Sequence, residues 1–259
     1  MLPSLFIAHG SPMLAIEDNE YSQFLGQLHW AISRPRAIVL FSAHWLSLVQ
    51  QVSASQKHTM MYDFGGFPQE LYSIEYPASG DATLSQEIAS LLGEAGVPCQ
   101  LEAGRGLDHG AWVVLRRVFP DADIPVIAMS VNPRLKPEQQ YAIGQALAAL
   151  RSQDVLLIGS GGTVHNLRAL AFSEPDKIDD WAVTFDDWIT KALQVWDLKS
   201  LFSYAVQAPH ASLAVPPGGN EHLVPLFYAM GAADHEQKAT LLHRSYQFGN
   251  LSHTVWQFG

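Results

Sequence analysis

The sequence predicts an α/β fold in which a mostly parallel central sheet is flanked by helices. Short apolar runs rich in β-branched residues are typical of buried strands. They alternate with segments whose apolar residues recur at three- and four-residue spacing, which is typical of helices and indicates βαβ units. The chain has 259 residues and 48% of them are hydrophobic, so one domain can bury a large core. We therefore expect residues 1–259 to form a single domain.

Each predicted element follows from its local pattern. The predicted strands are residues 5–8, 37–42, 124–131 and 155–159. The predicted helices are residues 81–95, 111–118, 137–151 and 179–196. Residues 63–77 are aromatic and rich in turn-forming residues, without a period of their own, so they predict a structured loop over the edge of the sheet.

Composition excludes several classes of partner. The formal net charge is −10, with 25 acidic and 15 basic residues and no basic cluster, which argues against nucleic acid. Cys99 is the only cysteine, so an internal disulfide is impossible and a metal site could use one thiolate at most. No apolar stretch reaches the ~18 residues that span a membrane. The N-terminus lacks the basic region of a signal peptide, and the expected location is the cytoplasm.

Five of the eleven histidines stand at junctions between predicted elements. His9 and His44 follow predicted strands, and His165 follows a strand and a Ser-Gly-Gly-Thr turn, whereas His109 and His222 precede helical segments. Ligands of open α/β sheets gather at such strand ends. Any one of these histidines could be a hydrogen-bonded structural residue. Together they predict a metal site, because burying several imidazoles requires several partners.

The residue types favour iron or zinc over other metals. Imidazole nitrogen suits these metals, whereas magnesium and calcium prefer oxygen ligands. The wide separation of the histidines excludes a zinc finger and is typical of a catalytic site that the fold assembles. The Ser-Gly-Gly-Thr turn lacks the lysine of a phosphate loop, so a nucleotide site is the weaker interpretation.

Other polar residues predict solvent-exposed positions. The acidic segment 174–187 is expected to be a solvated helical face rather than a source of metal ligands. The six remaining histidines are expected mostly at the surface. They are His29, His58, His210, His235, His243 and His253.

At the junction histidines the sequence resembles the 4,5-DOPA extradiol dioxygenase-like family, within the class III extradiol ring-cleavage dioxygenases. The resemblance runs through almost the whole chain. The segments that carry it are FIAHGSPM, AIVLFSAHW, YDFGGFPQELYSIEYPASGD, GLDHGAWVVLRRVFPDADIPVIAMSVN, LLIGSGGTVHNL and EHLVPLFYAMGAA. Residues 215–219, Val-Pro-Pro-Gly-Gly, depart from the His-Pro-Thr-like stretch that often stands there, and this bears on substrate contacts.

The resemblance implies one divalent metal per chain, held by His9, His44 and His222. Glu221 is the alternative to His222, because the wider class uses a glutamate there. The resemblance also implies that His165 lies beside the metal, as a fourth ligand when the resting protein holds zinc, and that His109 lies near the substrate. Fe(II) is expected for activity and Zn(II) in the protein as isolated.

The implied activity is extradiol cleavage of a catechol such as DOPA. Fe(II) would bring the catechol and O₂ together, and His165 or His109 would serve as acid/base because imidazole titrates near neutral pH. One rival is a zinc hydrolase with His165 or Glu221 as base. A second is a silent metal-binding module, against which the retention of all the junction histidines argues.

Overall fold

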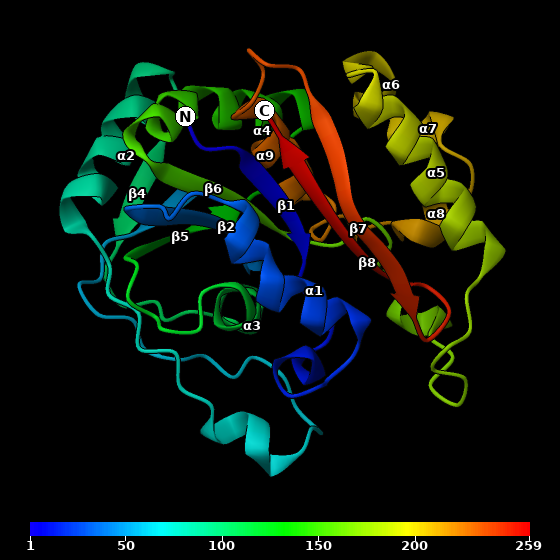
Figure 1. The fold of residues 1–259 in the computed structure, drawn as a ribbon. Coiled ribbons are helices and arrows are strands. Elements are labelled where there is room, and N and C mark those ends of the chain that lie inside the picture. The colour runs from blue at the N-terminus through cyan, green and yellow to red at the C-terminus, as the bar shows by residue number, and fades with distance from the viewer.

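The computed structural model, which describes residues 1–259, is built around one eight-stranded sheet of order β4-β3-β5-β2-β6-β1-β8-β7 (Figure 1). The strands are β1 (Ser4–Ala8), β2 (Ala37–Leu46), β3 (Gln50–Ser53), β4 (Cys99–Glu102), β5 (Val126–Val131), β6 (Val155–Gly161), β7 (Ala239–Gln247) and β8 (Leu251–Phe258). β5, β2, β6 and β1 run parallel in the middle. β8 and β7 extend one side antiparallel. On the other side β3 is antiparallel to β5 and parallel to β4. The mostly parallel central sheet predicted from the sequence is confirmed.

The four predicted strands are the four parallel strands of the centre. Their buried faces explain why they are continuously apolar in the sequence. β2 does not end at Ser42, as predicted, but continues to Leu46 with a shift of register against β5 after Phe41. His44 therefore lies within β2, near its end, and not beyond the strand. The sequence analysis missed β3, β4, β7 and β8, whose polar residues hide the strand pattern.

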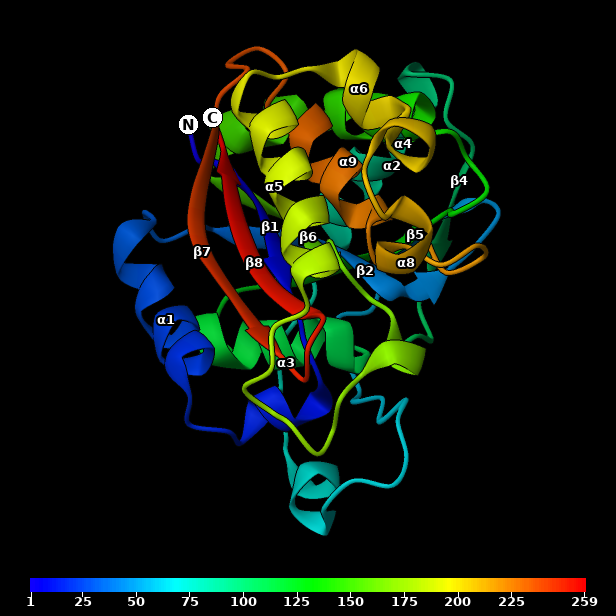
Figure 2. The same ribbon diagram turned by 90° about the vertical axis from the view of Figure 1, so that its right-hand side faces the viewer.

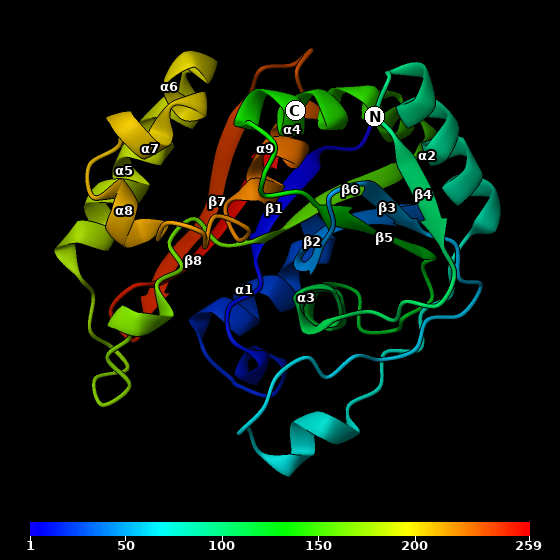
Figure 3. The same cartoon turned by 180° about the vertical axis from the view of Figure 1, so that it is seen from behind.

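Helices cover both faces of the sheet. They are α1 (Glu20–Leu28), α2 (Ala82–Glu94), α3 (His109–Val118), α4 (Pro137–Ala146), α5 (Asp180–Gln194), α6 (Leu198–Phe202), α7 (Tyr204–Gln207), α8 (Ala211–Ala214) and α9 (Val224–Gly231). α1 and α3 lie on one face, and α2, α4, α5 and α9 on the other (Figures 2 and 3). None of the helices combines the length and the apolar character that crossing a membrane requires.

The predicted helices correspond to α2, α3, α4 and α5. Aspartates begin two of them: Asp81 accepts a hydrogen bond from the Leu84 N–H of α2, and Asp108 accepts one from the Ala111 N–H of α3. The predicted helix 137–151 is divided in two, because α4 ends at Ala146 and a 3₁₀ helix, Ala148–Gln153, follows it.

The aromatic segment 63–77 has no strand or α-helix, and only a short 3₁₀ helix, Gln69–Ser73. We predicted that this segment covers the edge of the sheet, but it packs on α3 instead. Phe64 and Phe67 contact the same core as α3, and the Trp112 indole N–H donates to the Met61 carbonyl at 3.1 Å. The segment therefore borders the N-terminal half of α3, where His109 begins the helix.

Three polar residues expected at the surface are buried: His58, His253 and Asp186. His58 donates a hydrogen bond to the Val126 carbonyl at 2.7 Å, and His253 stacks on Tyr21 with 4.5 Å between ring centroids. Asp186, on α5, accepts hydrogen bonds from two hydroxyl groups of β7 and β8. The surface prediction failed for these residues because their partners lie on elements distant in the sequence.

Two glycines of β6 bring the start of α9 against the sheet. A Cβ atom on Gly159 would lie 2.2 Å from the Pro225 carbonyl oxygen, and one on Gly161 would lie 2.0 Å from the His222 carbonyl oxygen. Both distances are far below van der Waals contact, so any larger residue would push β6 and α9 apart.

Gly159→Ala is therefore expected to destabilise the fold, because the added methyl group meets backbone atoms that cannot rotate away. We expect a loss of about 1–3 kcal/mol or more in the free energy of unfolding. Gly93→Ala is the matched control, since nothing lies within 4 Å of that position in α2. It should stabilise by about 0.5–1 kcal/mol. Urea unfolding of both variants tests the contrast, and equal effects would contradict it.

Candidate metal centre

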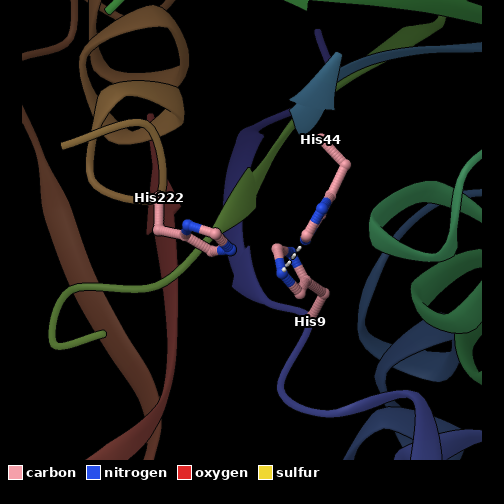
Figure 4. A group of neighbouring side chains, drawn as sticks. All are labelled: His9, His44 and His222. Atoms are coloured by element: carbon pink, nitrogen blue, oxygen red, sulfur yellow. Dashed lines mark hydrogen bonds between the residues drawn. The ribbon is translucent and has the colours of Figure 1, made fainter. Parts of the chain in front are cut away.

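Three histidines from different elements meet at the carboxyl ends of the central strands. His9 follows β1, His44 is near the end of β2, and His222 comes just before α9. Figure 4 shows their rings turned toward one another. One ring nitrogen from each lies within 4.8 Å of those of the other two. The side chains that the sequence singled out as metal ligands are thus brought together.

The spacing of these rings is close to that of ligands around one ion. The Nε2 atoms of His9 and His44 are 3.1 Å apart, and the His222 ring centroid is 5.0 Å from each of the other two. Two imidazole nitrogens bound to one metal at ordinary bond lengths and angles are about 3.0–3.4 Å apart. The His9 and His44 pair already has this separation.

Hydrogen bonds fix which nitrogen of His9 and His222 carries the proton. Ser160 Oγ donates its own hydrogen to the Gly110 carbonyl, so it accepts from His9 Nδ1–H at 3.1 Å. The Glu221 carboxylate accepts from His222 Nδ1–H at 3.2 Å. The Nε2 lone pairs therefore point into the site, and His222 Nε2 is buried without any hydrogen-bond partner. This arrangement, with an oxygen on the outer nitrogen, is typical of metal-bound histidine.

Burial keeps these imidazoles neutral. It lowers the pKa of His9 and of His222 well below the usual value, and the neighbouring histidines lower both further. Burial, followed by the charge of His109, lowers the pKa of His44 to about 3. Neutral imidazole is the form that binds metal. The two Nε2 atoms of His9 and His44 lie within hydrogen-bond distance, at 3.1 Å, and the buried Nε2 of His222 has no partner, so the donor set fits a divalent metal.

Asp63, which the sequence analysis did not identify, lies between two of the predicted site residues. Its Oδ1 atom accepts hydrogen bonds from His109 Nδ1 at 3.0 Å and from the His109 backbone N–H at 2.9 Å. Its Oδ2 atom lies 3.5 Å from His44 Nδ1. Burial opposes ionisation of Asp63, but the hydrogen bonds from His109 outweigh it and lower the pKa of Asp63 to about 2. The only signal in the sequence was its place at the start of the aromatic segment.

His109 is held beside His44 by the first turn of α3. Asp108 caps the helix and accepts a hydrogen bond from Ser42 Oγ at 2.5 Å, which joins α3 to β2. A Cβ atom on Gly110 would lie 2.9 Å from His44 Cδ2, so glycine permits the close approach. The ring centroids of His109 and His44 are 3.9 Å apart as a result. The structure thus places His109 within the site.

His165 lies beside the three converging rings and is not one of them. Its ring stacks on His222, with centroids 3.5 Å apart and planes 8° from parallel. Its backbone N–H donates to the Ala214 carbonyl at 3.0 Å, which ties it to the segment that leads to His222. Burial, followed by the charges of His44 and His109, lowers the pKa of His165 to about 4. A neutral imidazole next to the ligand set can accept a proton.

Comparisons with known proteins agree with this geometry. Residues 3–259 match the family described as the catalytic LigB subunit of aromatic ring-opening dioxygenase. The chain is 39% identical to a 4,5-DOPA dioxygenase extradiol of Beta vulgaris, over 98% of this chain and 96% of that protein. It is 36% identical to one of Escherichia coli K12, over 100% and 95%. An uncharacterized Escherichia coli K12 protein of known crystal structure matches with a TM-score of 0.85 and 32% identity over 100% of both chains.

Lowering the pH from 7 to 5 is expected to destabilise the metal-free protein. Unfolded histidines bind protons below about pH 6.5, whereas folded His165 stays neutral down to about pH 4. The unfolded state therefore holds more protons, and the free energy of unfolding falls as the pH drops below 6.5. One such group contributes up to about 2 kcal/mol by pH 5. Urea unfolding at pH 7, 6 and 5 measures this, and the decline should be shallower in His165→Gln. An equal decline of the free energy of unfolding in the wild type and in His165→Gln would contradict the lowered pKa of His165.

Proposed function

Because the chain belongs to the family of catalytic LigB subunits of aromatic ring-opening dioxygenases, we propose that its substrate is a catechol, with DOPA the first candidate. The family confirms the resemblance noted in the sequence, and the chain is an extradiol ring-opening dioxygenase that acts on an aromatic compound. DOPA is proposed because it stands in the names of relatives that match over the full chain. The observation that carries the proposal is the convergence of three neutral imidazoles at the strand ends.

We propose that His9, His44 and His222 hold the metal, with Fe(II) for activity and Zn(II) in the protein as isolated. The fixed Nδ1 hydrogens of His9 and His222, and the partnerless Nε2 of His222, support this assignment. When bound, the metal supplies the centre at which catechol oxygens and O₂ come together and through which electrons pass. Glu221 serves as the acceptor for His222 Nδ1, which supports His222 rather than Glu221 as the ligand.

His165 and His109 are the proposed proton-transfer residues. His165 is the first choice for the acid/base, because it is neutral, next to the ligand set and on a segment without regular structure. Its proposed role as a fourth zinc ligand ends when substrate arrives, because catechol and O₂ would need three of the six positions around iron and the other three histidines fill the rest. Release would also free the ring to act as the acid/base. Asp63 holds the hydrogen of His109 on Nδ1, so His109 Nε2 is available to a substrate hydroxyl group. The Phe64 ring lies almost perpendicular to the His109 ring, with 5.7 Å between the ring centroids, and is proposed to contact the substrate.

The two rival functions are not favoured. The relatives that match over the full chain are named as dioxygenases, not hydrolases, and all five junction histidines lie in one site here. We propose a cytoplasmic location, with which a single cysteine and no disulfide are consistent.

Metal-stripped protein reconstituted anaerobically with Fe(II) is expected to consume oxygen and give a yellow ring-opened product when L-DOPA and then O₂ are added. The same protein loaded with Zn(II) should consume none, because zinc has no redox chemistry. An oxygen electrode and absorption spectra record both. If the iron-loaded protein takes up no oxygen with L-DOPA or with simpler catechols, the proposed function is wrong.

Substitutions should separate the ligands from the proton-transfer residues. His9→Ala, His44→Ala and His222→Ala are each expected to abolish tight metal binding, because each removes one of three donors. His165→Ala and His109→Ala should keep the metal and lose turnover by about 10²–10⁴-fold, as for general acid/base groups.

Titration of each variant with Zn(II), followed by steady-state kinetics of those that bind Fe(II), tests these expectations. Wild-type metal affinity in one of the first three variants would remove that residue from the ligand set. A His165→Ala variant that cannot hold Fe(II) would make His165 a permanent ligand and pass the acid/base role to His109.

A further inference from the structure

We propose that Asp63 is a positioning residue that sets the orientation of two site histidines and favours the hydrogen on Nδ1 in both, the metal ligand His44 and the proton-transfer residue His109. This inference rests on the proposed function for the roles of the two histidines. Asp63 belongs to neither the strands nor the helices of the fold. Its carboxylate nevertheless makes the contacts that decide which nitrogen each ring presents to the pocket.

The two carboxylate oxygens of Asp63 contact different histidines. Oδ1 accepts two hydrogen bonds, from His109 Nδ1 at 3.0 Å and from the His109 backbone N–H at 2.9 Å. Oδ2 faces His44 Nδ1 at 3.5 Å. An ionised carboxylate can only accept hydrogen bonds, so His109 carries its hydrogen on Nδ1, and the same carboxylate favours the form of His44 with its hydrogen on Nδ1. In that form the Nε2 atom of each ring keeps a free lone pair.

The other acceptors at the site, Asp108, Ser160 and Glu221, have hydrogen-bond partners of their own. The hydrogen bonds of Asp108 go to Ser42, Arg105 and the first turn of α3. His9 and His222 have separate partners, Ser160 and Glu221, which each serve one ring. Asp63 alone serves two, so a change at this position reaches the ligand set and the proton-transfer group together.

The segment around Asp63 is anchored well enough to hold the carboxylate in place. The Met61 N–H donates to the Leu107 carbonyl at 2.8 Å, and the Met61 carbonyl accepts from the Trp112 indole at 3.1 Å. Tyr62 donates to the Ile74 carbonyl at 2.7 Å, which closes the aromatic segment on itself. These hydrogen bonds hold Asp63 beside the first turn of α3, where His109 lies.

An amide in place of the carboxylate separates the two functions of Asp63. In Asp63→Asn the amide oxygen should take the Oδ1 position, because two N–H groups of His109 point there. The amide NH₂ then faces His44 Nδ1–H, donor against donor. His44 can relieve this only by moving its hydrogen to Nε2, which removes the lone pair that binds metal.

The experiment is Zn(II) titration of metal-stripped protein by calorimetry, followed by kcat and KM for L-DOPA at saturating Fe(II). Asp63→Asn should weaken metal affinity by about 10–100-fold, the usual effect of losing the partner of a ligand. Its kcat at full metal occupancy should fall less than that of Asp63→Ala, because His109 keeps its acceptor. Asp63→Ala should lose metal affinity to a similar extent and also lose kcat as His109→Ala does.

Two controls bracket this result. Asp121→Asn, an exposed position with the same chemical change, should alter neither metal affinity nor kinetics. Glu221→Gln should weaken metal binding less than Asp63→Asn. Glu221 contacts only the His222 ring, so the amide oxygen of the variant can still accept the hydrogen bond from His222 Nδ1. Circular dichroism and thermal unfolding show whether each variant is folded.

Wild-type metal affinity in both Asp63 variants would overturn the proposal, as would equal losses of kcat in Asp63→Asn and Asp63→Ala. Two metal ions in the wild type and one in Asp63→Asn would also overturn it, because Asp63 would then be a ligand. The metal affinity is measured by Zn(II) titration in the absence of substrate. If no catechol is cleaved by the wild type while Asp63→Asn still weakens Zn(II) binding, the proposed function fails and the positioning of His44 stands.

Discussion

The close approach between the end of β6 and the start of α9 is the constraint on which the candidate metal centre depends. Only glycine fits at position 161, where a Cβ atom would lie 2.0 Å from the His222 carbonyl oxygen. The end of β6 also forms backbone hydrogen bonds with the segments that carry His9 and His222. The His9 N–H donates to the Gly161 carbonyl at 3.1 Å, and the Gly162 N–H donates to the His222 carbonyl at 2.8 Å. Three segments that are far apart in the sequence are thereby fixed to one short stretch of backbone.

Burial of the imidazoles links stability to metal binding. Removing several histidines from water disfavours their charged forms, and it also lowers the pKa of each ring next to another. A metal ion competes with protons for imidazole nitrogen. Because the fold has already removed those protons at neutral pH, the ligand set needs no deprotonation to bind a cation. The hydrogen bonds on Nδ1 complete this preparation, since they leave the free lone pair on the inner nitrogen.

Sequence reasoning predicted the parts of this protein that depend on local pattern. The parallel central strands are continuously apolar, and three of the site histidines, His9, His44 and His165, stand near the ends of those strands, so both features could be predicted without a structure. β7 and β8 were missed because residues such as His243 and His253 interrupt their apolar pattern. Asp63 was missed for a related reason: its two partners are remote in the sequence, and nothing near it marks a carboxylate that serves two rings. The burial of Asp186 likewise depends on hydroxyl groups that only the folded β7 and β8 bring to it.

The site is divided between a rigid part and a part that can vary. The three converging rings are held by central strands and by the start of α9, which glycines press against the sheet. The groups proposed to transfer protons also contact segments with little regular structure: His109, on the first turn of α3, is bonded to Asp63 of residues 63–77, and His165 belongs to residues 162–166. Residues 215–219 lie between Ala214, whose carbonyl accepts a hydrogen bond from the His165 N–H, and His222, the third histidine of the candidate metal centre. Loops tolerate substitution better than the elements they connect. Substitutions in these segments can therefore alter the surroundings of the substrate while the three converging histidines keep their geometry, and residues 215–219, where the sequence analysis expected a departure from the family pattern, are one such segment.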